Sequence, residues 1–284
     1  MRRNLLFWLG GSVIGALLGG SQPAAAQARS PVRTLSFGIV PQQSAGKLAR
    51  AWIPVLGALS ERAGLLLRFS TAPDIPAFER RLAAGAYDIA YMNPYHYSVF
   101  AQKPGYVAFA KEKERRLRGL VVVRKDSAIK DMKELAGQQI AFPAPASFGA
   151  TLLVRAEFER LGVPIKPVFV KSHESVYLNV AQRQVEAGGG IVHTLQDTEA
   201  SVRDALRVLW QTTDYTPHAF AAHPRVQAAD LQALRAAMLT ADSDPRMRSA
   251  LEAIGFKGFD AAQDAEWNDV RALGIRTLAA LLKE

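Results

Sequence analysis

Residues 139–162 read QIAFPAPASFGATLLVRAEFERLG, and this stretch carries the pattern that decides the fold. Residues 139–142 have the composition of a short buried strand, two prolines then turn the chain, and residues 148–161 have helical spacing closed by Gly162. A helix that starts after a strand in this way offers free backbone N–H groups and a positive dipole end, and Ser147 adds a hydroxyl. Such a helix start can hold an anion. A second strand, turn and helix follow, and they bring up His173.

The same alternation of strands and helices extends outward from this stretch along most of the chain. Strands are predicted at 34–40, 65–70, 87–92, 106–110, 117–124, 139–142, 168–171, 186–189 and 206–211. Helices are predicted at 46–62, 75–84, 94–102, 130–136 and 148–161. Further helices are predicted to begin at 173 and at 194, and the C-terminal third from 226 is predicted to be helical. Alternation of this kind predicts an α/β fold with mostly parallel sheets whose faces are covered by helices.

The N-terminus has the features of an export signal. A basic segment at 1–4 precedes an apolar stretch at 5–20 that is too short to favour a membrane span, and small residues follow at 26–28. We therefore expect residues 1–28 to be a signal peptide cleaved near Ala28, which places the mature protein in the periplasm. An uncleaved membrane anchor is the alternative, and Arg2-Arg3 leaves the twin-arginine export route open beside general secretion.

Composition limits what the mature chain can be. Residues 29–284 exceed the length at which one compact core is comfortable, which predicts two lobes. The chain has no cysteine, so it has no disulfide, thiol nucleophile or thiolate metal site. The formal charge is +9, of which Arg2 and Arg3 contribute two, and a basic balance suits anionic ligands.

The densest basic run, KEKERRLR at 111–118, alternates its charges with glutamates. We interpret it as the solvated face of a hairpin or loop, because nucleic-acid binding favours a basic stripe with interleaved aromatics and little acid. No nucleic-acid partner is expected. His96, His193 and His218 do not have metal-ligand spacing, so no metal site is predicted either.

Ligands of open α/β sheets bind where strands end and loops enter helices. In this chain those loops lie at 40–44, 71–74, 91–95, 144–149, 172–173 and 189–194, and four of the six hold hydroxyls, amides or an imidazole. This clustering predicts a polar binding site at the strand ends.

Short motifs occur in a fixed order between Ser36 and about Leu282: FGIVP at 37–41, W-x-P at 52–54, GAYDIA at 85–90 with NPY at 93–95, P-x-S at 145–147, HESV at 173–176, VEAG at 185–188, and a final pattern GF at 255–256, FD at 259–260 and Trp267. Together they resemble the phosphate/phosphite/phosphonate-binding proteins of ABC transporters, a branch of the type 2 periplasmic binding proteins.

The resemblance implies two α/β lobes joined by two hinge crossings, near 122–125 and 212–220. Lobe one would comprise residues 33–122 plus 221–284, and lobe two residues 123–220 with the return crossing. The implied function is capture of a small phosphorus oxyanion (phosphate, phosphite or a simple phosphonate) by lobe closure. A monomer without a cofactor would then deliver this ligand to an ABC permease.

The resemblance also implies the residues that hold the ligand. The oxyanion would be held by the hydroxyl of Ser147, the N–H groups of Phe148, Gly149 and Ala150, and His173, with Thr151 as a second hydroxyl. The opposite wall would be formed by Tyr91, Asn93 and Tyr95. Relatives that bind aminoalkylphosphonates place acidic residues on the return crossing, and residues 215–220 have none, which disfavours an ammonium-bearing ligand.

Other interpretations of the same residues remain. Ser147 is a helix N-cap in any fold, and His173 could cap its own helix or bond a loop carbonyl. The same fold could serve a sensor or chemotaxis receptor instead of a permease. A Ser/His hydrolase is a third possibility, but the chain has no G-x-S-x-G motif, and Glu174 is the one carboxylate with an evident place near the histidine. We therefore expect no enzyme activity.

Overall fold

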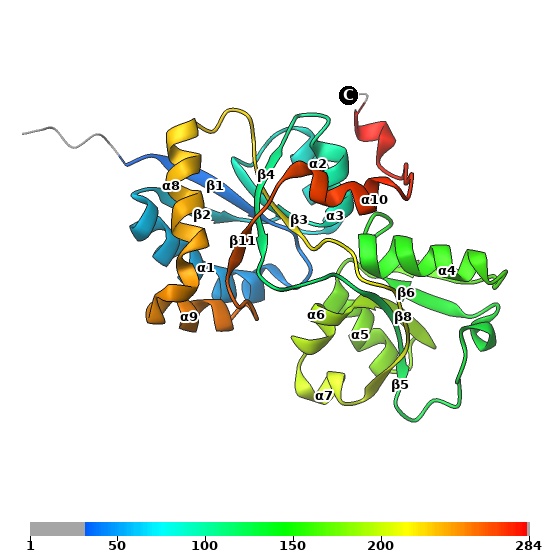
Figure 1. Cartoon of the computed structure of the whole chain (residues 1–284). Coiled ribbons are helices and arrows are strands. Elements are labelled where there is room, and N and C mark those ends of the chain that lie inside the picture. Colours follow the sequence, from blue (N-terminus) through cyan, green and yellow to red (C-terminus); the bar gives the residue numbers. More distant parts are fainter. Residues whose placement is uncertain (1–31, 283–284) are drawn as a thin grey trace, which may run out of the picture. The chain divides into compact units, whose positions relative to one another are not determined.

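The computed structural model describes residues 32–282, which form two β-sheets covered by helices (Figure 1). The predicted signal peptide at 1–28 lies outside these residues. Within the described range, no helix is both long enough and apolar enough to span a bilayer.

The six-stranded sheet has the strand order β11 (Phe259–Ala261), β4 (Val107–Glu112), β10 (Ala219–Ala222), β3 (Ile89–Met92), β1 (Thr34–Ile39) and β2 (Leu66–Ser70). Helices α1 (Ala45–Ala63), α2 (Ile75–Ala83), α3 (Pro94–Phe100), α8 (Ala228–Leu239), α9 (Pro245–Glu252) and α10 (Asn268–Arg271) pack around it. Its core contains a cluster of aromatic rings in which Trp52, Tyr91, Phe220 and Phe256 contact one another.

The five-stranded sheet has the order β7 (Lys166–Phe169), β6 (Gln139–Phe142), β8 (Ala187–Ile191), β5 (Gly119–Arg124) and β9 (Leu206–Gln211). Side chains of β5 alternate between two cores: Val121 and Val123 pack with α4 (Val154–Arg160), and Leu120 and Val122 pack with α5 (His173–Ala181). The short helices α6 (Val192–Gln196) and α7 (Ala200–Arg203) lie with α5. Both faces of this sheet are therefore covered, as strand–helix alternation predicts.

The expectation of mostly parallel sheets is wrong, because both sheets are mixed. The pairs β1–β2, β1–β3, β6–β7 and β6–β8 are parallel, whereas β3–β10, β10–β4, β4–β11, β8–β5 and β5–β9 are antiparallel. Helical crossovers produce the parallel pairs. Strands β5 and β10 instead enter their sheets directly from the opposite sheet, without such a crossover, and they run against their neighbours.

The two crossings between the sheets lie at 113–118 and 212–218. Strand β4 ends at Glu112 in the six-stranded sheet and β5 begins at Gly119 in the other, so the first crossing lies earlier than the predicted 122–125, and the predicted lobe boundary at 122 falls inside β5. The return crossing overlaps the predicted 212–220. The two segments pair with each other, because Leu117 N donates to Tyr215 O at 2.8 Å and Tyr215 N donates to Leu117 O at 2.9 Å.

Three local predictions need correction. The segment predicted as one helix over 148–161 begins as a π-helix, η2 (Phe148–Leu153), before α4. The C-terminal third is not wholly helical, because β11 completes the six-stranded sheet. The run at 111–118 is the end of β4 and a loop that forms the first crossing, so the loop alternative holds and the hairpin does not, and its face is not wholly solvated because Glu112 is buried.

Candidate functional site

Two helix starts meet at one point of the structure. Ser147 is the N-cap of η2, and His173 is the first residue of α5. The Ser147 hydroxyl makes no capping bond and lies 3.3 Å from Nε2 of His173, and both residues are buried. Ser172 caps α5 instead, by accepting from Ser175 N at 3.1 Å. The capping interpretations of Ser147 and His173 therefore do not describe their side chains.

The glycines of β8 explain why the two helix starts come so close. A Cβ at Gly189 would lie 2.0 Å from the carbonyl oxygen of Ala150, and a Cβ at Gly190 would lie 2.2 Å from the hydroxyl of Tyr177. Successive strand residues face opposite sides of a sheet, so η2 packs directly on one face of β8 and α5 on the other. A side chain at Gly189 would push η2 away from β8 and separate Ser147 from His173, and one at Gly190 would displace the Tyr177 ring.

The π-helical turn leaves several backbone donors available at its start. Thr151 N and Leu152 N both donate to Ser147 O, at 2.9 and 3.1 Å. The N–H groups of Phe148, Gly149 and Ala150 precede them, so they have no acceptor within the helix. They are the donors expected at an anion-binding helix start.

A small cavity of about 10 Å³ lies at this junction. This is close to the space that one water molecule needs. Residues of both lobes and both crossings line it: Val40, Gln42, Ile75, Asn93, Leu117, Ser147, Phe148, Gly149, His173, Ile191 and His218. Polar groups from the two lobes thus converge on one enclosed point.

Asn93 and Gln42 connect the lobes beside the cavity, the first through its side chain and the second through its backbone oxygen. Asn93 caps α3 by accepting from His96 N at 2.8 Å, and its amide nitrogen donates to Ala146 O at 3.3 Å. The backbone oxygen of Gln42 accepts from His173 N at 3.1 Å. The side-chain amide of Gln42 donates to Nε2 of His218 at 3.2 Å. These contacts hold the two walls together in the conformation that the structure shows.

No charged side chain is among the eleven residues that line the cavity. Burial lowers the pKa of His173 to about 3, and burial together with neighbouring histidines and Arg115 lowers the pKa of His218 well below its usual range. Both imidazoles are therefore neutral near pH 7. An anion here would be held by hydrogen-bond donors and helix dipoles rather than by a cation.

The structure brings together Ser147, Phe148, Gly149, His173 and Asn93, and the other four predicted site residues lie elsewhere. Thr151 is fully buried and its hydroxyl donates to Ala144 O at 2.7 Å, so it is no second donor to the cavity. The Tyr95 hydroxyl accepts from Leu278 N at 2.9 Å in a different part of the six-stranded lobe. Ala150 does not line the cavity and its carbonyl packs against β8, although its N–H remains one of the donors at the helix start. Tyr91 stacks on His218, with ring centroids 5.0 Å apart, and lies behind the cavity wall.

Sequence reasoning did not assign Gln42 or His218 to the site. Gln42 lies in one of the strand-end loops that were expected to carry the site, and His218 stands on the return crossing where relatives have acidic residues. The sequence feature that could have identified them is their position, in a strand-end loop for Gln42 and on the return crossing for His218. Nothing in the local pattern distinguishes Gln42 from Gln43, and only the packing of the two lobes selects one of them.

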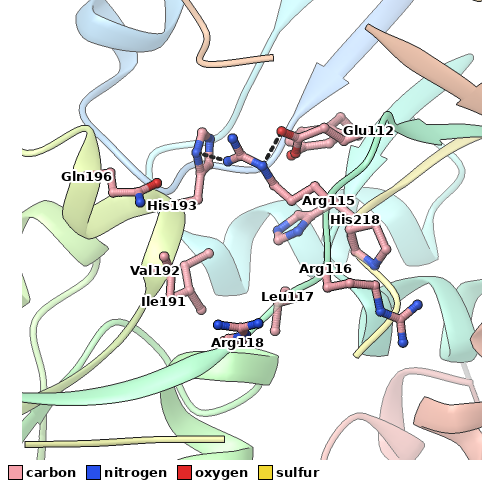
Figure 2. A pocket seen from close by; sticks show the side chains of 12 residues that line it. Glu112, Arg115, Arg116, Leu117, Arg118, Ile191, Val192, His193, Gln196 and His218 are labelled. Carbon is pink, nitrogen blue, oxygen red and sulfur yellow. Dashed lines mark hydrogen bonds and ion pairs between the residues drawn. The ribbon is translucent and has the colours of Figure 1, made fainter. Parts of the chain in front are cut away.

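A second cavity, of about 140 Å³, adjoins the first and shares Leu117, Ile191 and His218 with it. Figure 2 shows His193, Arg115 and Glu112 in a row on its wall. Arg115 forms an ion pair with Glu112 at 2.5 Å, contacts His193, and donates to Gly255 O at 2.8 Å. Burial raises the pKa of Glu112 and Arg115 opposes that rise, while burial with Arg115 nearby lowers the pKa of His193 to about 3.

Two sheets joined by two crossings, with polar groups at their junction, define a type 2 periplasmic binding protein. Residues 37–267 match the family model described as "ABC transporter, phosphonate, periplasmic substrate-binding protein". The match covers most of the chain, so this protein belongs to that family and the predicted resemblance is confirmed.

Individual relatives are similar along nearly the whole chain. "Phosphate-import protein PhnD" of Mycolicibacterium smegmatis is 22% identical over 292 residues, which cover 92% of this chain and 86% of that protein. The binding protein component of an ABC phosphonate transporter from Pseudomonas aeruginosa has a TM-score of 0.78 at 19% identity, with 86% of each chain covered. PhnD1 from Prochlorococcus marinus in complex with methylphosphonate also has a TM-score of 0.78, at 16% identity, with 85% of this chain and 97% of that chain covered.

Proposed function

We propose that this protein captures a small phosphorus oxyanion (phosphate, phosphite or a simple phosphonate) by closing its lobes over the Ser147–His173 cavity, and delivers it to an ABC permease. The observation that carries the proposal is the convergence of two helix starts, Ser147 and His173, at one buried point. Relatives whose names refer to phosphate import and to methylphosphonate are consistent with this ligand class. The exported monomer acts in the periplasm and needs no cofactor or metal.

Lobe closure follows from where the donors lie. Asn93 and Gln42 come from the six-stranded lobe, and Ser147 and His173 from the five-stranded lobe. A ligand can shift the protein toward the closed state only if it binds that state more tightly than the open one. A phosphorus oxyanion has several heavy atoms and is larger than the cavity of about 10 Å³ that the structure shows, so the walls must part to admit it. Donors from both lobes then reach it only when the walls close on it.

Two features argue against the alternative of a Ser/His hydrolase. A general base must accept a proton, but burial holds the pKa of His173 at about 3, and the group facing its Nδ1 is the hydroxyl of Thr194 at 3.2 Å rather than a carboxylate. Glu174 lies 3.5 Å from Lys47 Nζ and does not orient the histidine. These contacts favour a binding site over a nucleophile–base pair.

The site also favours a ligand without an ammonium group. No carboxylate lines the cavity, and the nearby buried Glu112 is paired with Arg115. A buried ammonium would therefore lack a partner. We expect phosphite or methylphosphonate to bind more tightly than 2-aminoethylphosphonate.

The test is titration calorimetry of the mature protein with phosphate, phosphite, methylphosphonate, 2-aminoethylphosphonate and sulfate. Ser147→Ala and His173→Ala should each weaken binding about tenfold to a hundredfold, the cost of one hydrogen bond to a charged group. Tyr95→Phe removes a hydroxyl outside the cavity and should leave affinity unchanged. Failure of every oxyanion to bind would refute the proposal. Ligand uptake that depends on a permease, rather than on a sensor kinase, would separate transport from the receptor alternative.

A further inference from the structure

A chain of buried hydroxyls stands behind His173, on the side away from Ser147. Nδ1 of His173 lies 3.2 Å from Thr194 Oγ1, and Thr194 Oγ1 lies 2.8 Å from the Tyr177 hydroxyl. Tyr177 in turn accepts a hydrogen bond from Ile191 N at 3.2 Å. His173, Thr194 and Tyr177 are all buried, so the chain is shielded from water at every step.

The three side chains come from neighbouring elements that β8 holds together. Tyr177 lies one turn after His173 on α5, and Thr194 lies on α6, which follows β8 directly. The Tyr177 hydroxyl reaches this place because Gly190 has no side chain: a Cβ there would lie 2.2 Å from it. The oxyanion site by itself does not require a glycine at position 190. Gly190, the last glycine of the run at 188–190, makes room for this hydroxyl.

The hydroxyl of Thr194 decides which nitrogen of His173 carries the proton. Besides the Tyr177 hydroxyl, with which either oxygen can be the donor, it has two acceptors within reach, Ile191 O at 3.2 Å and His173 Nδ1 at 3.2 Å. When it donates to Nδ1, the imidazole proton is on Nε2 and points toward Ser147 and the cavity. When it donates to Ile191 O, Nδ1–H donates to Thr194 and Nε2 presents only a lone pair to the cavity.

An oxyanion distinguishes between these two states. A bare Nε2 lone pair would face the negative oxygen, whereas an Nε2–H group would donate to it. The Tyr177 hydroxyl accepts from Ile191 N and can give its own proton either to Ile191 O at 3.1 Å or to Thr194 at 2.8 Å. When it donates to Thr194, the donor-to-acceptor bonds run in one sense from Ile191 N to the ligand, and bonds aligned in this way strengthen one another.

We propose that Tyr177 and Thr194 are positioning residues that hold the neutral His173 with its proton on Nε2 when an oxyanion is bound. The proposal rests on the proposed function, because it assigns these residues to the same site. The proposal is consistent with the uncharged lining of the cavity. Because burial keeps His173 neutral, ligand binding can move the imidazole proton from one ring nitrogen to the other without adding a second proton. Neither residue touches the ligand.

The test compares Thr194→Val, which removes the hydroxyl and keeps the shape, with Thr194→Ser, which keeps the hydroxyl. Methylphosphonate affinity should fall about tenfold or more in Thr194→Val, by the cost of a buried group left without its partner, and Thr194→Ser should restore most of it. Tyr177→Phe should give a smaller loss. Thr198→Val is the matched control, since its buried hydroxyl bonds Thr194 O and does not reach His173. Thermal melts identify any variant that fails to fold, and Tyr177→Phe then serves in place of Thr194→Val.

Nitrogen-15 NMR of the imidazole gives a readout that a purely structural role would not change. In wild-type protein with methylphosphonate, the signals should show a proton on Nε2, and in ligand-free Thr194→Val the Nδ1 signal should shift relative to ligand-free wild type. Unchanged affinity in a folded Thr194→Val variant, or a proton on Nδ1 in the complex, would overturn the proposal. If wild type binds no phosphorus oxyanion, the proposed function is wrong. If the Nδ1 signal of the ligand-free protein nevertheless shifts in Thr194→Val, the hydroxyl chain is still supported as the contact that sets the proton position on His173.

Discussion

The two adjoining cavities at the junction of the lobes are built from opposite kinds of chemistry. The Ser147–His173 cavity is lined by amides, a hydroxyl, neutral imidazoles and apolar side chains. Its neighbour has Glu112, Arg115 and His193 on its wall, and Arg115 bonds elements of both lobes there. The first cavity is suited to exchanging a ligand, because its lining has no charged side chain that would lose its partner when the ligand leaves. The second is suited to holding the crossing in place, because breaking a buried ion pair is costly.

The comparison predicts that variants of the two regions separate affinity from stability. Changes in the neutral cavity should weaken ligand binding with little loss of stability, and changes in the charged row should do the reverse. The predictions that follow test this separation.

The largest effect is expected from Gly189→Val, which inserts a side chain between β8 and η2. The new Cβ would lie 2.0 Å from the backbone oxygen of Ala150. Because this clash is with backbone, rotating a side chain cannot relieve it. Unfolding free energy should fall by about 3 kcal/mol and oxyanion binding should be lost. Denaturant unfolding and calorimetry measure both.

Gly57→Ala is the matched control for this substitution. Gly57 lies inside α1, where a Cβ would meet nothing within 4 Å. Alanine is the better helix former, so stability should rise by about 0.5–1 kcal/mol without a change in affinity. An equal loss of stability in both variants would contradict the close-packing argument for β8.

The next largest effect is expected from Arg115→Met, which leaves Glu112 buried without its partner. Glu112 is only 3% exposed and burial raises its pKa to about 8, so the loss of Arg115 should be measured at pH 9, where the carboxylate is ionised, and the unfolding free energy should fall there by about 2 kcal/mol. Restoring stability with Glu112→Gln in the same chain would show that the unpaired carboxylate is the cause. Affinity for phosphite should change less than in Ser147→Ala, and a larger change would erase the distinction between the two cavities.

Acidification should destabilise the protein through its buried histidines. The pKa of His173 and of His193 is about 3 in the folded protein, against 6.5 for an unperturbed histidine. The unfolded chain therefore binds more protons between these values, so this stability is complete above pH 6.5 and is lost as pH falls toward 3. Each group contributes a slope of up to about 1.4 kcal/mol per pH unit. His218, whose pKa burial also lowers, acts in the same direction, and Glu112 and Asp197, whose pKa values burial raises, oppose the histidines. Unfolding curves between pH 4 and 7 test this, and His173→Gln should make the slope shallower.

The smallest effect concerns affinity at ordinary pH. Because His173 and His218 stay neutral, affinity for methylphosphonate should follow only the ligand's own ionisation between pH 6 and 8. An additional titration near pH 6.5 that disappears in His173→Ala would show a cationic histidine in the site. That result would remove the contrast between a neutral cavity and a charged neighbour.

Much of the candidate site was predictable because its residues sit at local landmarks. Ser147 follows a proline turn at a helix start and His173 opens the helix after the next strand, and both landmarks are visible within a few residues of sequence. Gln42, His218, Thr194 and Tyr177 were not assigned to the site, because their roles depend on contacts between segments far apart in the chain. Thr151 and Tyr95 fitted the motif by position, but their hydroxyls bond the backbone away from the cavity.

The sequence by itself determined the alternation of strands and helices, the two helix starts and the family to which the chain belongs, since each depends on short-range patterns. The tertiary structure decided the direction of the strands that cross between sheets, the burial of Glu112 and Arg115's role beside it, and the neutrality of His173. Those properties follow from which surfaces meet, and desolvation or close packing acts only after distant segments have come together.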